Sequence, residues 1–94
     1  MSSHWLSQEV DAAMQERDLL QLERDNRGFL KDIRLTDIDL DHRMQMAGIS
    51  CLMKLEMDNA SSPEAKKGIY DRYNNGMLES IGEYNEQVKK ILGL

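Results

Sequence analysis

The sequence predicts an all-α protein: a three-helix antiparallel bundle, or a helical hairpin, with a long C-terminal amphipathic helix. Charged residues make up 31% of its 94 residues, aromatic residues only 5%, and there is a single proline. This composition favours helices over sheets. The last third of the chain also repeats apolar residues with helical spacing. The length allows one domain, residues 1–94, in which we expect helices at roughly 4–34, 37–58 and 62–92.

The first helix has an apolar face that changes side along its length. One side carries Leu6, Val10, Ala13, Met14 and Leu20, and nearly the opposite side carries Leu19, Leu22, Phe29, Leu30 and Ile33. The helix either breaks near Asn26-Arg27-Gly28, where glycine is a natural C-terminal cap, or it continues and contacts different neighbours. We favour continuity. The seven-residue series Trp5, Ala12, Leu19, Asn26 and Ile33 supports it, and one glycine costs a helix only about 1 kcal/mol.

The second helix is expected to begin after Thr36, with Asp39 three residues further on in a variant of the capping box. It has two apolar faces. The main one is formed by Leu40, Met44, Ala47, Cys51, Leu52 and Leu55, and the other by Met46, Ile49, Met53 and Met57. A helix with two apolar faces is the middle one of three or lies at an interface. We expect Cys51 to pack in the core, because buried thiols behave as small hydrophobes.

The third helix has the clearest start, at Ser61-Ser62-Pro63-Glu64. Serine caps free backbone amides, proline suits the first helical position, and an early carboxylate favours the positive helix end. Its apolar stripe comprises Ile69, Tyr70, Tyr73, Met77, Ile81, Tyr84, Val88, Ile91 and Leu92. The same helix can be written as heptads with Asn74 at an a position, where asparagine fixes register. This pattern allows pairing with another copy, although it covers barely three heptads, and an antiparallel hairpin with the second helix explains the same stripe.

The charge and the cysteine count limit the classes of partner. The net charge of −5 argues against nucleic acid and anionic membranes, which need a basic patch. No apolar run approaches the ~20 residues of a membrane span. The single cysteine rules out an internal disulfide, and we expect a reducing, cytoplasmic setting.

The sequence offers no recognisable catalytic or metal site. Asp37, Asp39 and Asp41 resemble the start of a calcium loop, but His42 and Gly48 stand where that loop needs glycine and a bidentate glutamate. We expect His42 to be an ordinary surface histidine beside carboxylates. No catalytic triad, phosphate loop or dinucleotide fingerprint is present, so we expect no enzyme activity, cofactor or bound metal.

These features predict a small acidic protein–protein interaction module, such as an adaptor, a regulatory subunit or a secretion-type chaperone. It would bury apolar anchors of a partner helix, or of a second copy in a dimer, in a groove. Methionine is common at adaptable binding surfaces, and tyrosine suits half-wet interfaces. The expected partner-binding residues are Met46, Ile49, Met53, Met57, Tyr70, Tyr73, Met77 and Tyr84. The alternatives are an assembly subunit of a larger phage or secretion apparatus, or an acidic regulator of a nucleic-acid-binding protein.

Overall fold

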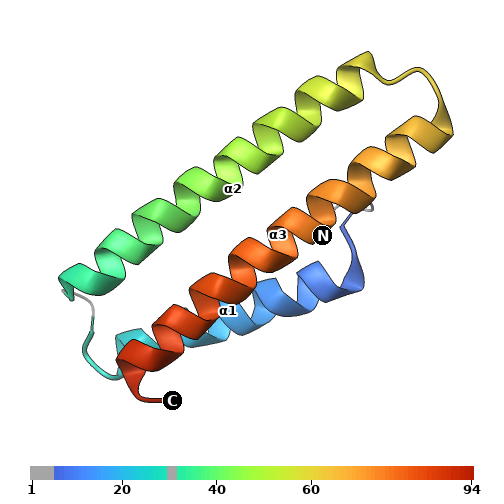
Figure 1. Cartoon of the computed structure of the whole chain (residues 1–94). Coiled ribbons are helices and arrows are strands. Elements are labelled where there is room, and N and C mark those ends of the chain that lie inside the picture. The colour runs from blue at the N-terminus through green and yellow to red at the C-terminus, as the bar shows by residue number, and fades with distance from the viewer. Residues whose placement is uncertain (1–5, 30–31) are drawn as a thin grey trace.

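Three helices form the structure, which is a computed structural model that describes residues 6–29 and 32–94. They are α1 (Gln8–Asn26), α2 (Ile33–Asn59) and α3 (Pro63–Leu92). Helices α2 and α3 run antiparallel as a long hairpin, and α1 packs on the half of that hairpin near the C-terminus (Figure 1). The molecule is elongated, with extents of 49 × 22 × 20 Å. The predicted helical bundle with a long last helix is confirmed.

Both ends of α3 follow from local sequence. The Ser62 hydroxyl accepts a hydrogen bond from the Ala65 amide, and Pro63 takes the first helical position, as predicted. At the other end Gly93 is left-handed, with φ of 75°, and the preceding turn holds Lys89 and Lys90. Glycine reaches that conformation without a Cβ clash, and the lysines complement the negative helix end.

The first predicted helix is divided, and our preference for a continuous helix through Gly28 was wrong. Helix α1 ends at Asn26, and Gly28 has φ of 79°. The amides of Arg27 and Phe29 donate to the carbonyls of Glu23 and Arg24, which closes the helix end. The heptad series does not form one buried stripe, because Leu19 is exposed. Its Trp5 lies outside the described residues.

Helix α2 therefore begins earlier than predicted, with Asp32 rather than Thr36 as its cap. The Asp32 carboxylate accepts a hydrogen bond from the Arg34 amide and also pairs with the Arg34 guanidinium. These bonds lower the pKa of Asp32 to about 2, chiefly through the side-chain bond to Arg34. Thr36 lies in the first turn instead, where its hydroxyl donates to the Asp32 carbonyl.

The core lies where α1 covers the hairpin. Two clusters of buried side chains form the core. The first consists of Leu20, Leu35, Tyr84, Val88 and Leu92. The second consists of Val10, Met77 and Ile81. Two buried asparagines of α3 hold the α1 backbone beside them. Asn74 Oδ1 accepts from the Ser7 amide at 2.8 Å, and Asn85 Nδ2 donates to the Ala13 carbonyl at 3.2 Å. Asn74 thus fixes where α1 begins on α3.

The other end of the hairpin has no comparable core. No residue from 43 to 73 is buried, although this range covers the second half of α2 and the first third of α3. We call residues 50–73 the distal arm, which extends beyond α1 in Figure 1. Its best-covered apolar side chains are only half-buried: Met53, Met57, Ile69, Tyr70 and Tyr73. Because packing supplies most of the stability of a helix in a protein, the arm is weakly held by this chain alone.

We predict opposite effects for alanine at two glycines. Gly28→Ala should lower the free energy of unfolding by about 1–2 kcal/mol, because alanine is strained at positive φ. Gly68→Ala, in regular α3 where an added Cβ would meet nothing within 4 Å, should raise it by up to about 1 kcal/mol. Urea denaturation followed by helical circular dichroism measures both. Equal effects at the two positions would contradict the assigned end of α1.

Candidate interaction surfaces

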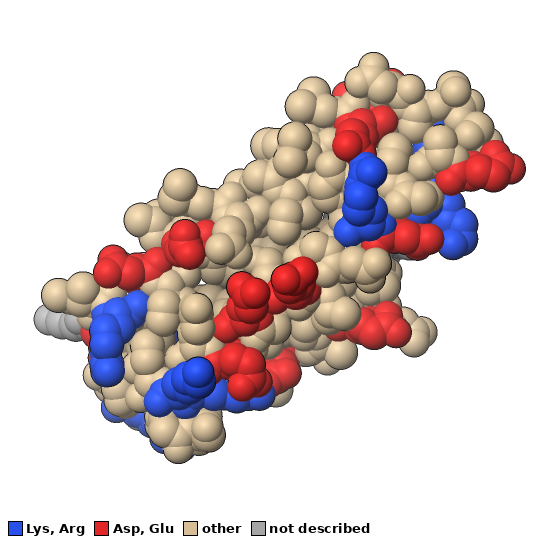
Figure 2. All heavy atoms as spheres, in the orientation of Figure 1, with Lys and Arg blue, Asp and Glu red and all other residues tan. Residues whose placement is uncertain are grey.

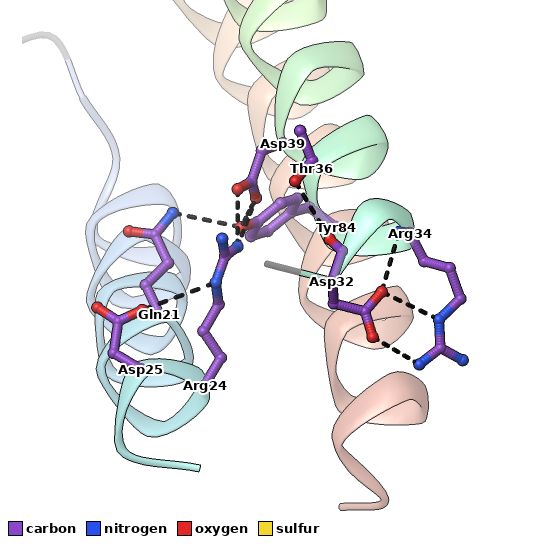
Figure 3. Close-up of polar contacts among 8 residues, drawn as sticks. All are labelled: Gln21, Arg24, Asp25, Asp32, Arg34, Thr36, Asp39 and Tyr84. Carbon is purple, nitrogen blue, oxygen red and sulfur yellow. Dashed lines mark hydrogen bonds and ion pairs between the residues drawn. The ribbon is translucent and has the colours of Figure 1, made fainter. Parts of the chain in front are cut away.

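A polar junction joins all three helices around Asp39 of α2. Arg24 Nη1 of α1 donates to both carboxylate oxygens of Asp39, at 2.9 and 2.7 Å. The Tyr84 hydroxyl of α3 donates to Asp39 Oδ1 at 2.5 Å, and Gln21 Nε2 donates to the Tyr84 oxygen at 3.3 Å. Figure 3 shows these side chains converging from α1, α2 and α3. The junction is thus a point where the three helices hold one another.

His42 extends this junction by one helical turn and is buried, not on the surface as we expected. Its ring stacks on Tyr84, with ring centroids 4.5 Å apart. Arg17 Nη1 lies 2.9 Å from His42 Nε2, and because arginine can only donate, Nε2 accepts. His42 Nδ1 then carries the proton and faces Ser80 Oγ at 3.5 Å, while Ser80 donates to Gln45.

The surroundings of the junction set the protonation of its members. Burial lowers the pKa of His42, and the Arg17 charge lowers it further, so the imidazole is neutral at pH 7. Burial and the hydrogen bond to Asp39 raise the pKa of the Tyr84 phenol, which stays a donor. These side chains bond chiefly to one another. The junction therefore joins the three helices through polar contacts.

The main apolar face of α2, on which we expected Cys51 to pack in the core, lies on the surface. We call it the outer stripe: Leu40, Met44, Ala47, Cys51, Leu52 and Leu55. Its four largest members, Leu40, Met44, Leu52 and Leu55, are 58%, 66%, 56% and 61% exposed. Cys51 is exposed too, which contradicts our expectation of a core thiol. The stripe spans about four turns of an otherwise polar surface, and isolated exposed leucines do not account for it.

The polar junction explains why the opposite side of α2 faces inward. The inward side includes Leu35 and His42, which are buried, and Asp39, which bonds to α1 and α3. Turning the outer stripe inward would carry Asp39 and His42 away from Arg24 and Tyr84. Periodicity alone gave more weight to the side with more leucines. The signal it left unused was an aspartate and a histidine at helical spacing along the other side.

A groove runs between α2 and α3 along the border of the outer stripe. It includes an open hollow of about 440 Å³, whose lining comes from α2 (Met44, Gln45, Gly48, Ile49 and Leu52) and from α3 (Gly76, Glu79, Ser80 and Glu83). An added Cβ at Gly48 or Gly76 would meet nothing within 4 Å. Figure 2 shows a largely uncharged surface over α2 beside acidic side chains over α3. The groove thus has one apolar wall and one acidic wall.

The eight predicted partner-binding residues fall into three places. Met77 and Tyr84 are in the interior of the chain, and a partner would reach them only if the helices separated. Met46 and Ile49 are partly buried against the cluster of Val10, Met77 and Ile81. Met53, Met57, Tyr70 and Tyr73 are half-buried in the distal arm, where Arg72 also lies 5.1 Å from the Tyr73 ring. Their role in binding stays a prediction.

The described residues contain neither a membrane-spanning helix nor a metal-binding cluster. Of the helices at 8–26, 33–59 and 63–92, none has the length and apolarity that crossing a bilayer requires. Within the same part of the chain, no three His, Cys, Asp or Glu side chains gather as metal ligands. Comparisons with protein families, with curated proteins and with solved structures find no match.

We predict that Asp39→Asn lowers the free energy of unfolding by about 2 kcal/mol, because it removes the nearer of the two carboxylates that pair with the largely covered Arg24 guanidinium and leaves only the more distant Asp25. Asp41→Asn, on the exposed side of the same helix, should change it by less than about 0.5 kcal/mol. Urea denaturation at pH 7 measures both variants. Equal losses would mean that Asp39 stabilises only through general charge, and not through the junction.

We predict that His42 makes the protein less stable in mild acid. Its folded-state pKa lies below the ordinary value of 6.5, so the unfolded chain takes up this proton first. Stability should fall as the pH drops through 6.5, and the loss should be complete below the folded-state pKa. Urea midpoints between about pH 7.5 and about pH 5.5 should fall more for the natural chain than for His42→Gln. Parallel pH profiles of the two proteins would contradict the buried, neutral histidine.

Proposed function

We propose that this chain is a small helical protein–protein interaction module, such as an adaptor, a regulatory subunit or a secretion-type chaperone. The observation that carries the proposal is the outer stripe of α2. Its four large side chains are each more than half exposed along one face of one helix. Contiguous apolar surface of this kind marks interaction sites in soluble proteins, because its burial by a partner releases ordered water.

The distal arm supports the same proposal. It carries apolar side chains along two helices, yet none of its residues is buried within the chain. A partner packed against Leu52 and Leu55 would give the arm the third layer that α1 gives the other half of the hairpin. Binding and stabilisation of the arm would then be one event, since a partner that binds only the folded arm stabilises it.

The groove defines the chemistry of the partner. Its apolar wall suits the apolar face of an amphipathic helix, and its glycines at 48 and 76 leave room for that helix to approach. Glu79 and Glu83 on the other wall are exposed and would face the side of the incoming helix. We therefore propose a partner helix with lysine or arginine along one edge of its apolar face. Acidic side chains at that edge of the partner helix would be repelled by Glu79 and Glu83.

Cys51 supports a cytoplasmic place of action for this module. Its thiol is exposed on the outer stripe, and an exposed free thiol is stable in a reducing compartment.

A second candidate function is an assembly subunit of a larger structure. The observation in its favour is another exposed apolar pair, Leu19 and Leu22 of α1, in addition to the outer stripe on α2. A molecule with two different apolar surfaces can associate head to tail with other copies and form open assemblies. Masses that grow without limit as the concentration rises would favour this candidate over a module of fixed stoichiometry.

Photo-crosslinking in the cell that makes the chain tests the proposed function. We expect benzoyl-phenylalanine at position 52, at the edge of the groove, to yield discrete adducts that contain a second protein. The matched control is the same group at position 66, an exposed site in the first turns of α3. The adducts should weaken when Glu79 and Glu83 are both changed to lysine. Adducts no stronger from position 52 than from position 66 would exclude the interaction function.

A further inference from the structure

Four residues of the outer stripe, with one charged residue before them and one after them, form a set whose spacing is the same from either end. The set is Asp37, Leu40, Met44, Ala47, Cys51 and Lys54, which we call the seam. Its steps along the chain are three, four, three, four and three residues. Alternating steps of three and four keep side chains on one face of a helix that packs against another helix. All six side chains are exposed, and Met44 also lines the groove between α2 and α3.

We propose that the seam is a self-association surface, on which α2 of one copy packs antiparallel against α2 of a second copy. The spacing allows this, because a two-fold axis between Gln45 and Met46 brings each seam residue opposite another seam residue. Leu40 then faces Cys51 of the second copy, and Met44 faces Ala47 of the second copy. Each layer combines a large side chain with a small one, which fills the space between closely packed helices.

The charges at the ends of the seam select the antiparallel direction. Asp37 ends the seam on one side and Lys54 on the other. Antiparallel packing places Asp37 of each copy opposite Lys54 of the other, whereas parallel packing would place like charges together at both ends. Asp37 and Lys54 have no ion-pair partner among residues 6–29 and 32–94, so both charges are available. Opposite charges thus coincide at both ends only in the antiparallel arrangement.

The interface between two seams is small, and its size sets the dissociation constant that we expect for the dimer. From Asp37 to Lys54 the seam is about 26 Å long, at 1.5 Å per residue. A single pair of helices over this length falls in the small class of interfaces, so we expect a dimer with a dissociation constant in the micromolar range. The inference rests on the proposed interaction function and names a second copy as the occupant of the seam, next to the groove.

Charge reversal tests the pairing and its direction. Asp37→Lys alone, and Lys54→Asp alone, should each raise the dimer dissociation constant by about tenfold in sedimentation equilibrium, because two like-charge contacts replace two opposite ones. The double variant Asp37→Lys, Lys54→Asp should return it to within about twofold of the natural value. The control Lys66→Asp, outside the seam, changes the net charge by the same amount as Lys54→Asp and should leave dimerisation unchanged. Failure of the double variant to recover dimerisation would overturn the antiparallel pairing.

Disulfide formation tests the register. In the proposed register Cys51 of the two copies is about 16 Å apart along the helices, too far for a disulfide, whereas position 40 lies opposite Cys51. Mild oxidation should therefore link Leu40→Cys into dimers through its native Cys51. The natural chain should not be linked, and neither should the control Leu40→Cys, Cys51→Ser. Rapid linking of the natural chain through Cys51 alone would overturn the register.

The outcomes separate this inference from the proposed function. A chain that stays monomeric up to several hundred micromolar, and forms no Leu40→Cys dimer, would refute self-association. Adducts from position 52 that contain another protein would still support the interaction function in that case. If position 52 gave no adducts but dimers formed and depended on Asp37 and Lys54, self-association would be supported and the proposed partner helix would be excluded.

Discussion

The contact of Asp39 with Arg24 and Tyr84 is the constraint on which the arrangement of the helices depends. It joins α1, α2 and α3 within one cluster of hydrogen bonds. Removing charged groups from water costs several kcal/mol unless they are paired, so these groups permit few other packings. Asp39 must face Arg24, and this requirement sets the rotation of α2 about its own axis. The rotation in turn decides which of its two apolar faces is covered.

The exposed stripe on α2 is a consequence of that rotation. With Asp39 and His42 directed inward, the side of α2 that carries Leu40, Met44 and Leu55 points outward. The inner side carries Asp39 and His42 together with apolar residues such as Leu35, and the outer side carries exposed leucines. An exposed apolar surface of this kind is consistent with a surface used for binding.

Local signals predicted α3 well, but they did not predict where α1 ends or where α2 begins. Ser62, Pro63 and Gly93 fix both ends of α3 through bonds within a few residues, so the sequence sufficed there. Gly28 was harder, because a glycine within a periodic pattern is compatible with a helix or with its end, and the difference depends on packing of α1 against α3. The end of α1 is held partly by a contact between residues 65 apart in the sequence, in which Arg27 Nη1 donates to the Leu92 carbonyl of α3.

The periodicity of apolar residues was not enough to predict which face of α2 is directed inward. Counting apolar residues ranks the two faces of α2, but it assigns no energy to the partners of Asp39 and His42 on other helices. Those partners, Arg24 and Arg17, lie 15 and 25 residues away in the sequence. The error about Cys51 has the same origin, since it follows directly from the face on which that residue lies.

Self-association and partner binding would share part of α2, because Met44 belongs to the seam and also lines the groove between α2 and α3. A second copy on the seam would cover Leu40, Met44, Ala47 and Cys51 of the outer stripe, whereas Leu52 and Leu55 are not part of the seam. The α3 wall of the groove, with Glu79 and Glu83, also lies outside the seam. A partner helix held by Leu52, Leu55 and these carboxylates would therefore fit beside a second copy, whereas a partner helix that needs Met44 would compete with it.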